Sequence, residues 1–333
     1  MSLNMQIINN HTVLQYQSLQ CKDEQGFDTL NVFFKATFNI EPELSLAKEQ
    51  LPLCTADEYF FEPETSSLKY ASDFSLGKLS TDIIIQGCAI PANQQEVDKM
   101  LVDIQVHKTQ LQLAVFGQRF WQGNKITAPK PFNKMPLVFE NAYGGKCPRT
   151  NDQDKNYSFL KNPVGKGYCV NKKVSNNLEL PNVEFIDQLI QSPKDRPEPA
   201  SLGFIAPSWM PRSNHAGTYD QAWQDTTAPD YPEDFNRIFN TMSNSRLRQS
   251  GYLKGGEAIA ISGMSENPIN FQLPYCPLWL EIKTLNKTLN PECLYESVLI
   301  EPLYNRLSIV WRSSIRTDTH TLRSLTIDYR QRR

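Results

Sequence analysis

The residue types that most often carry catalysis are spread through this chain without a pattern that brings them together. The Gly-x-Ser-x-Gly elbow, which presents the serine of an α/β-hydrolase, is absent. None of the four histidines lies in a His-x-x-x-His or Glu-x-x-His arrangement, which would place two metal ligands on one helix face: His11, His107, His215 and His320. We therefore expect no catalytic residues and no metal site, and we predict that the protein is not an enzyme.

Two glycine–lysine pairs invite comparison with phosphate-binding loops. A Walker A loop has an early glycine and then Gly-Lys followed by Ser or Thr, so that backbone amides cradle phosphates and a hydroxyl holds magnesium. Here Lys146 is followed by Cys147, and Lys166 is followed by Gly167. No Gly-x-Gly-x-x-Gly follows an expected strand either. We interpret both pairs as turns and expect no cofactor.

The seven cysteines do not form a recognisable ligand set. Their number is odd, and no two are spaced as Cys-x-x-Cys. Such spacing fits neither a zinc site nor a disulfide framework. Reduced and mostly buried thiols are therefore the expectation.

Residues 207–235, which we call the aromatic patch, combine rings, prolines and acids. Four carboxylates recur beside its aromatic side chains: Asp220, Asp225, Asp230 and Asp234. Paired carboxylates beside aromatic rings suit a hydrolase or a carbohydrate-binding module. The alternative is that these acids cap turns and a helix that begins at Pro232.

The same patch contains the side chains that most often anchor protein interfaces. Trp209, Tyr219 and Trp223 lie in it together with Arg212 and Asp220. Aromatic residues and arginine are enriched at interface hot spots. A small core that keeps an irregular segment in shape needs the same rings, so the composition leaves interface and core as alternatives.

β-Structure is expected at both ends of the chain and must position this patch. Strand-length runs separated by turn residues predict strands at 30–40, 81–88, 101–106, 110–116, 257–261, 269–273, 278–283, 294–300, 306–311 and 322–328. The tripeptide His107-Lys108-Thr109 would connect two of them as a hairpin. Helices are expected at 184–191 and from Pro232 to about residue 240, where proline and acids suit a first turn.

These elements predict a mainly β fold, of the α+β kind with few short helices. We expect antiparallel sheets in a sandwich-like arrangement, with long ordered segments rich in Pro and Gly in the middle. A single domain over residues 1–333 is expected, with β parts at 1–128 and 257–333 and an irregular, aromatic-rich part at 129–256. Residues 129–168 combine proline and glycine with apolar side chains, which indicates an ordered, packed loop.

The composition is typical of a globular protein, with 333 residues, 40 % of them hydrophobic and 21 % charged. The net charge of −2, from 34 basic and 36 acidic residues, argues against a general nucleic-acid binder. No apolar run approaches the ~20 residues that span a bilayer, and the start lacks the charged and apolar regions of a signal peptide. We expect a cytoplasmic protein without nucleic-acid or membrane partners.

Motifs in order along the chain carry a family resemblance. They include FFKATFNI at 33–40, SLKYASDFSLGKLSTDIIIQGCA at 67–89, FGQRFW at 116–121, PFNKMPLVFENAYGG at 131–145, NPVGKGY at 162–168, WMPRSNHAGTYDQAW at 209–223 and KGGE at 254–257. With these motifs the chain resembles the domain-of-unknown-function family 2169, which is found with bacterial type VI secretion systems. The resemblance covers nearly the whole chain.

What the resemblance implies is an accessory role based on protein–protein binding. Such proteins look like adaptors or chaperones that load a secreted effector protein onto the VgrG spike or a PAAR tip protein. The resemblance supplies no catalytic residues. The candidates for partner contact, the last three with lower weight, are Trp209, Arg212, Tyr219, Asp220, Trp223, Phe132, Tyr143 and Tyr168. An open strand edge that accepts a partner strand and a purely structural subunit of the secretion machine are alternatives.

Overall fold

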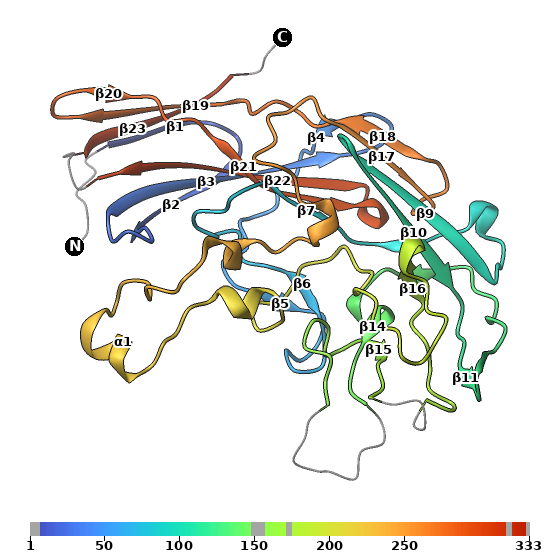
Figure 1. Ribbon diagram of the computed structural model, residues 1–333. Coiled ribbons are helices and arrows are strands. Elements are labelled where there is room, and N and C mark those ends of the chain that lie inside the picture. Colours follow the sequence, from blue (N-terminus) through green and yellow to red (C-terminus); the bar gives the residue numbers. More distant parts are fainter. Residues whose placement is uncertain (1–6, 148–156, 171–174, 318–321, 331–333) are drawn as a thin grey trace.

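β-Strands dominate the computed structural model of this chain, which describes residues 7–147, 157–170, 175–317 and 322–330 (Figure 1). Within these ranges, α1 (Gln221–Thr226) is the one α-helix, and the other helical turns are short 3₁₀ segments. Most strand pairs in the large sheets are antiparallel. The prediction of a mainly β fold with antiparallel sheets and few short helices is therefore confirmed.

The largest sheet of the described residues joins the two ends of the chain. Its order is β2-β3-β22-β21-β7, with β4 beside β3, and its strands are β2 (Gln15–Lys22), β3 (Asp28–Asn39), β4 (Ser45–Leu46), β7 (Asp82–Ile85), β21 (Leu294–Glu301) and β22 (Arg306–Arg316). β3 and β22 pair antiparallel along their length. Lys35 and Thr37, on the polar side of β3, are only 8 % and 3 % exposed. Both faces of β3 are therefore covered, whereas most polar side chains of the edge strand β2 are exposed.

A second sheet has five strands among the described residues, in the order β16-β10-β9-β17-β18. They are β9 (Lys99–Val106), β10 (Thr109–Phe116), β16 (Val183–Phe185), β17 (Ala258–Ser262) and β18 (Ile269–Gln272). β9 and β10 form the expected hairpin, and His107 makes its turn with a φ of 53°. Buried and exposed side chains alternate along most of β9, so one face of this sheet meets the core and the other meets solvent.

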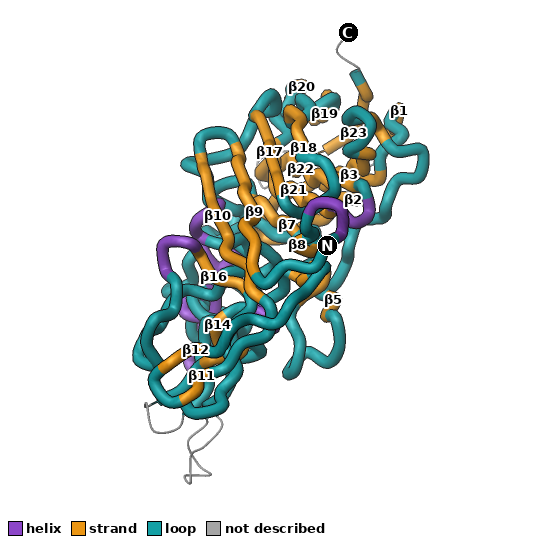
Figure 2. Tube along the Cα trace, turned by 90° about the vertical axis from the view of Figure 1, so that its right-hand side faces the viewer, coloured by secondary structure: helices purple, strands orange, loops and turns teal. Residues whose placement is uncertain are grey.

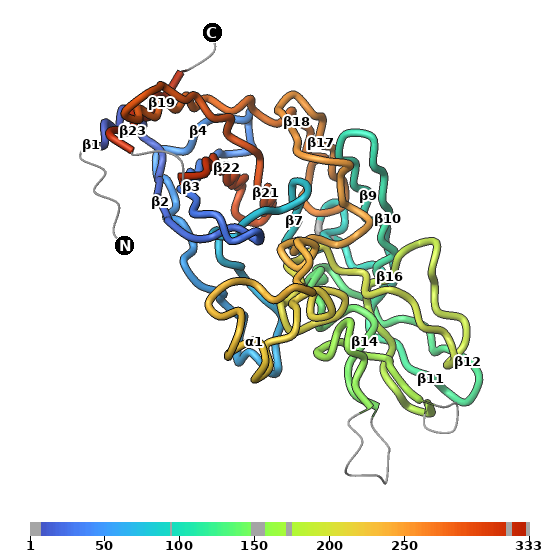
Figure 3. The backbone as a smooth tube through the Cα atoms, turned by 60° about the vertical axis from the view of Figure 1, so that its left-hand side comes forward, coloured from blue at the N-terminus to red at the C-terminus, as the bar shows by residue number. Residues whose placement is uncertain are grey.

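A third sheet, again counted over the described residues, has the order β1-β23-β19-β20. Its strands are β1 (Ile7–His11), β19 (Leu278–Thr284), β20 (Thr288–Leu289) and β23 (Leu322–Tyr329). The three sheets share one hydrophobic core, to which the first contributes Phe34, the second Val102 and the third Ile327. Figures 2 and 3 show these sheets gathered toward one end of the molecule and most of the irregular middle part toward the other.

Short strands and 3₁₀ turns shape the described segments outside the three large sheets. The strands are β5 (Glu58–Tyr59), β6 (Leu68–Tyr70), β8 (Cys88–Ala89), β11 (Trp121–Gln122), β12 (Lys125–Ile126), β13 (Met135–Pro136), β14 (Tyr143–Gly144) and β15 (Lys166–Gly167). The 3₁₀ turns are η1 (Ala92–Gln94), η2 (Phe139–Asn141), η4 (Ile186–Gln188), η5 (Arg212–His215), η6 (Arg237–Asn240), η7 (Ser245–Leu247) and η8 (Pro302–Tyr304).

Both predicted helices are wrong. The segment 184–191 holds the end of β16 and η4 instead. After Pro232, the Asp234 carboxylate accepts hydrogen bonds from the Thr218 amide at 2.8 Å and the Thr218 hydroxyl at 2.7 Å. Asn236 then adopts an extended backbone and caps η6 with its side chain. Because these side chains bond to backbone amides outside a helix, they compete with helical hydrogen bonding, and the segment forms a turn followed by a 3₁₀ turn.

Candidate protein-binding surface

The aromatic patch and the residues that follow it divide into a root and an exposed arm. The root, residues 207–215 and 237–243, contains buried side chains such as Trp209 and Met242. We call residues 216–236 the arm, and in Figure 1 it carries α1 away from the sheets. All residues of the arm are described, and Pro232 alone among them is fully buried. The arm has five acidic residues and no basic one. It is therefore a mostly solvent-exposed, negatively charged segment.

Asp220 starts α1 by capping its first turn. Its backbone is extended, and its carboxylate accepts a hydrogen bond from the Trp223 amide at 2.9 Å. Aspartate is among the residues preferred at this position, since it satisfies an amide that has no partner within the helix. The Trp223 indole N–H donates to the Asp230 carbonyl at 2.9 Å. Both hydrogen bonds join residues within the arm and stabilise its shape.

The aromatic rings of the arm pack on one another. Tyr219 and Trp223 meet edge to face with ring centroids 4.8 Å apart. The ring centroids of Tyr231 and Phe235 are 4.3 Å apart, and those of Phe235 and Phe239, which lies at the root, are 6.1 Å apart. Tyr219 is still 51 % exposed. The rings thus give the arm a defined shape and leave part of their surface open to solvent.

Two ion pairs link the arm to the hairpin of β2 and β3. The Lys22 ammonium lies 2.9 Å from the Asp230 carboxylate. Arg237, directly after the arm, lies 3.4 Å from the Glu24 carboxylate. All four side chains are partly exposed, and ion pairs in water attract weakly. The position of the arm therefore depends mainly on its root.

Trp209 and Arg212 lie in the root and take the core position, one of the two alternatives that the composition left open. Trp209 is 4 % exposed and packs edge to face on Phe139, with ring centroids 5.1 Å apart. Arg212 is 8 % exposed; its Nε donates to the Phe239 carbonyl at 2.9 Å, and another of its nitrogens donates to the Ile205 carbonyl. Arg212 thus joins the segments before and after the arm. Both side chains fill the core beneath the arm and are not exposed in the free chain, and partner contact by either stays a prediction.

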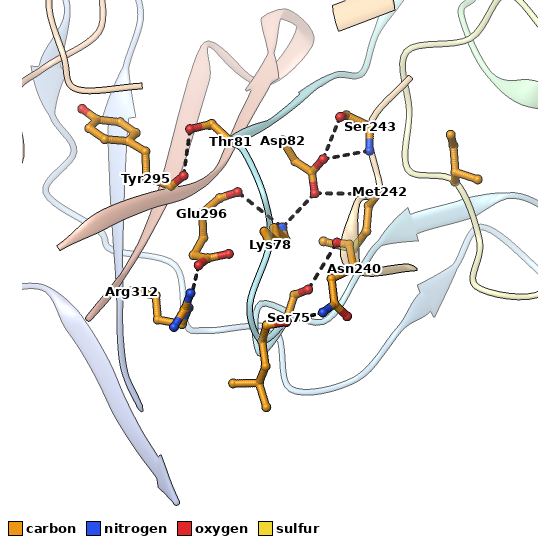
Figure 4. A network of polar contacts seen from close by, with 12 residues as sticks. Ser75, Lys78, Thr81, Asp82, Asn240, Met242, Ser243, Tyr295, Glu296 and Arg312 are labelled. Atoms are coloured by element: carbon orange, nitrogen blue, oxygen red, sulfur yellow. Dashed lines mark hydrogen bonds and ion pairs between the residues drawn. The ribbon is translucent and has the colours of Figure 1, made fainter. Parts of the chain in front are cut away.

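A buried charged network fixes the segment after the arm to the six-stranded sheet (Figure 4). Asp82 of β7 is fully buried and accepts hydrogen bonds from the Met242 amide at 3.0 Å, the Ser243 amide at 3.1 Å and the Ser243 hydroxyl at 2.7 Å. The Lys78 ammonium lies 2.8 Å from the same carboxylate and donates to the Glu296 carbonyl at 3.3 Å. A buried carboxylate with this many donors holds the root in one position.

A second buried ion pair continues this network. The Nε of Arg312 lies 2.5 Å from the Glu296 carboxylate, and Arg312 also donates to the Asn31 side chain at 3.1 Å. The other carboxylate oxygen of Glu296 has no hydrogen-bond partner among the described residues. Burial raises the pKa of Glu296 above its ordinary value of 4.5, against the opposing charge of Arg312. This side chain therefore favours its protonated form more than an exposed glutamate does.

The raised pKa of Glu296 predicts a pH dependence of stability. The folded chain keeps this proton at pH values where the unfolded chain has lost it, so the free energy of unfolding should fall as pH rises from 4.5 toward the folded-state pKa. Glu296→Gln cannot ionise and should lack this contribution to the slope when urea unfolding is measured across that range. Glu266→Gln changes an exposed glutamate and should keep it. Equal pH slopes for the two variants would contradict the prediction.

The three lower-weight candidates belong to other clusters. Phe132 is 8 % exposed and lies in the main core. Tyr143 is 2 % exposed, and its ring centroid lies 5.0 Å from that of Phe159 and 6.4 Å from that of the half-buried Tyr168. The Tyr143 hydroxyl donates to the Asp195 carbonyl at 3.1 Å, and burial raises the pKa of this tyrosine. Phe132 and Tyr143 are thus core side chains in the free chain, and partner contact by any of the three stays a prediction.

The structure brings forward side chains that the sequence candidates did not include. Tyr231 and Phe235 complete the ring cluster of the arm. Asp82 and Lys78 hold its root. Tyr231 and Phe235 could have been found from their position in the aromatic patch. Asp82 directly precedes three isoleucines, and an acid next to such an apolar run indicates a buried charge that needs a partner.

The carboxylates of the aromatic patch have separate structural partners: the Trp223 amide for Asp220, Gln221 for Asp225, Lys22 for Asp230 and Thr218 for Asp234. These are capping and pairing roles rather than a facing catalytic pair. In the ranges that the structure describes, no group of three or more His, Cys, Asp or Glu side chains is arranged to hold a metal ion. No helix in those ranges has the length and hydrophobicity needed to cross a membrane.

Comparison with known proteins places most of the chain in one family model. The model described as an uncharacterized protein conserved in bacteria, DUF2169, matches residues 25–312. This range begins between β2 and β3 and ends within β22. It therefore includes the arm, its root and the buried network. Neither a curated protein nor a solved structure matches the chain.

Proposed function

Because the chain belongs to the bacterial family DUF2169, we propose that it is a type VI secretion adaptor or chaperone. It binds a cognate effector in the cytoplasm and helps to load it onto the VgrG spike or a PAAR tip protein, by protein–protein binding without catalysis. The secretion role rests on the resemblance carried by the sequence motifs, which implies such an accessory role. The choice of contact surface is supported by the arm.

The observation that carries the proposal is a rigid ring cluster on an exposed segment. Tyr219 and Trp223 are held by ring packing, by the cap at Asp220 and by the bond to Asp230. Side chains that are already ordered lose little conformational entropy when a partner binds. Tyrosine and tryptophan are also the side chains most enriched among interface hot spots. The arm thus combines exposure with preorganisation, which an adaptor surface needs.

The charge of the arm indicates the chemistry of the partner. Its five acidic and no basic residues surround the two ring pairs. A complementary surface has an apolar centre for the rings and a rim of lysine or arginine. Opposite charges across an interface mainly accelerate association and favour the correct partner. Binding should therefore weaken as salt is raised, through a slower association rate.

Tyr219→Ala tests whether the arm makes the contact. Tyr219 is 51 % exposed, so its truncation should leave the melting temperature nearly unchanged and weaken effector binding at least about tenfold. Tyr304→Ala is the matched control, since Tyr304 is 63 % exposed and lies outside the arm. The affinities of both variants are measured with purified proteins, against effectors encoded beside the gene of this chain and against the spike protein. Equal binding by both variants would exclude the arm as the contact surface.

Deletion of the gene tests the secretion role itself. The cognate effector should no longer be delivered, while other effectors of the same apparatus are still secreted. A pull-down with this chain should retain the effector or the spike protein. If neither is retained and delivery survives the deletion, the adaptor proposal is wrong wherever the contact surface lies.

An open strand edge remains the alternative route to a partner. β2 and β18 stand at the ends of the strand orders of their sheets, as far as the described residues define them. An extended partner segment could add to either edge through main-chain hydrogen bonds. Normal binding by the Tyr219→Ala variant would direct attention to these edges. The hydrolase or carbohydrate-binding alternative has no comparable support, because the carboxylates of the arm are used in capping and pairing.

A further inference from the structure

Cys276 and Cys293 meet beside a cavity of about 560 Å³. Its walls also include Tyr252, Trp279 and Tyr295, and no residue of the arm. Both cysteines are partly exposed and pack at the margin of the main core. A small reagent that enters the cavity can therefore reach both thiols.

The starts of two strands bring these cysteines together. Cys276 lies two residues before β19, in the four-stranded sheet, and Cys293 lies directly before β21, in the six-stranded sheet. A second contact joins the same segments, because the Tyr295 hydroxyl donates to the Pro274 carbonyl. A covalent bond between the two sulfurs would tie one sheet to the other.

The two thiols interact directly, and the interaction makes them chemically unequal. Contact with Cys293 lowers the pKa of Cys276 despite its burial, with help from the Leu278 amide. Contact with Cys276, together with burial, raises the pKa of Cys293. Because the thiolate is the attacking species in disulfide exchange, Cys276 is the better nucleophile of the pair.

We propose that Cys276 and Cys293 are a redox site that closes reversibly to an intramolecular disulfide when the chain meets a small disulfide such as oxidised glutathione. The site is independent of the adaptor role and of the arm. Its closure joins the start of β19 to the start of β21.

The chemistry proceeds by two thiol–disulfide exchanges. The Cys276 thiolate attacks one sulfur of oxidised glutathione, its S–S bond breaks, and one glutathione leaves as a thiolate that takes up the proton lost by Cys276. Cys293 then gives up its proton and attacks the Cys276 sulfur of the mixed disulfide, which releases the second glutathione. The two protein thiols are oxidised by two electrons in total, and the glutathione disulfide is reduced to two thiols.

Cys169 shows what a structural thiol looks like in this chain. It is completely buried, and its thiol donates to the Pro193 carbonyl at 3.5 Å. Burial raises its pKa, against the opposing charge of Arg196. With its proton donated to a carbonyl and no exposed surface, Cys169 should stay reduced under conditions that oxidise Cys276 and Cys293.

Mass spectrometry of the full chain tests the proposal directly. After treatment with oxidised glutathione, the intact mass should fall by two hydrogen atoms, and the linked peptides should contain Cys276 and Cys293. Dithiothreitol should restore the original mass. The midpoint of thermal unfolding should rise by several degrees in the oxidised form, since the bond closes a loop and joins two sheets. An unchanged mass, or a disulfide that maps to another pair, would overturn the proposal.

Single variants test the assigned pair. Cys293→Ser leaves Cys276 without its resolving partner, so a stable glutathione adduct should accumulate on Cys276. Cys276→Ser removes the first nucleophile, so oxidation should stop at an adduct on Cys293 and form no internal disulfide. Cys54→Ser removes another partly exposed cysteine and should oxidise like the unchanged chain. A disulfide formed by either of the first two variants would contradict the assigned pair.

Discussion

Asp82→Ala should lower the free energy of unfolding by about 3–5 kcal/mol, because it leaves a buried ammonium without its carboxylate. The Lys78 side chain is 2 % exposed and lies 2.8 Å from Asp82. The change also removes the acceptor of three hydrogen bonds from Met242 and Ser243. Urea unfolding should show a lower midpoint with an unchanged dependence on urea concentration. The loss should be accompanied by loosening of the arm, whose root these bonds hold.

Asp187→Ala is the matched control for this prediction. Asp187 also pairs with a cation, since its two carboxylate oxygens lie 2.8 and 2.9 Å from a nitrogen of Arg246. Its side chain is, however, 59 % exposed. An ion pair of this kind contributes at most about 1 kcal/mol, so its loss should change the midpoint little. Similar losses for the two variants would show that burial of the Lys78–Asp82 pair is not what matters.

Gly145→Ala should destabilise the fold by about 2–5 kcal/mol, by strain and overpacking together. Gly145 has a φ of +88°, which side chains rarely adopt, and a Cβ there would stand less than 3.0 Å from the Gly165 carbonyl oxygen. That oxygen is a backbone atom, so it cannot move away by a side-chain rotation. The glycine is thus needed where the segments around β14 and β15 touch, and its replacement should lower both the thermal midpoint and the urea midpoint.

Gly251→Ala provides the comparison, because a Cβ at Gly251 would meet no atom within 4 Å and its φ is outside the left-handed range. This substitution should be neutral or stabilise the fold by up to about 1 kcal/mol, by restricting the unfolded chain. Effector binding by the folded fraction of Gly145→Ala should be normal if residues 129–168 are scaffold. A binding defect larger than the unfolded fraction explains would instead place this segment in the interface.

Much of the fold could be predicted from local sequence patterns. The β9–β10 hairpin follows from alternating side chains on both sides of a short polar connection, and its register is a local property. The predicted strands of the last third also appear, β22 with a longer extent than expected. The predicted helix after Pro232 failed because Thr218, which is distant in sequence, supplies hydrogen bonds to Asp234. Local helix propensity does not account for hydrogen bonds from such a distant residue.

The candidate site could be predicted only in part. The aromatic patch was located by composition, but Trp209 and Trp223 are the same residue type in the same motif and have opposite environments. Trp209 lies against Phe139, which reaches it from a distant segment. Trp223 lies against Tyr219 within the arm. Whether a side chain is buried depends on which distant segments pack against it. A single sequence does not reveal those tertiary contacts.

The residue inventory can be read from the chain alone: the lack of enzyme motifs, the run of short strands, the family motifs and the position of the aromatic patch. Which of these residues meet depends on the three-dimensional fold. It separated an exposed arm from a buried root, placed Asp82 beside Lys78 under that root, and brought together Cys276 and Cys293, whose spacing carried no signal. The physical reason is that pairing between strands distant in sequence, such as β3 with β22, fixes the neighbours of every side chain that they carry.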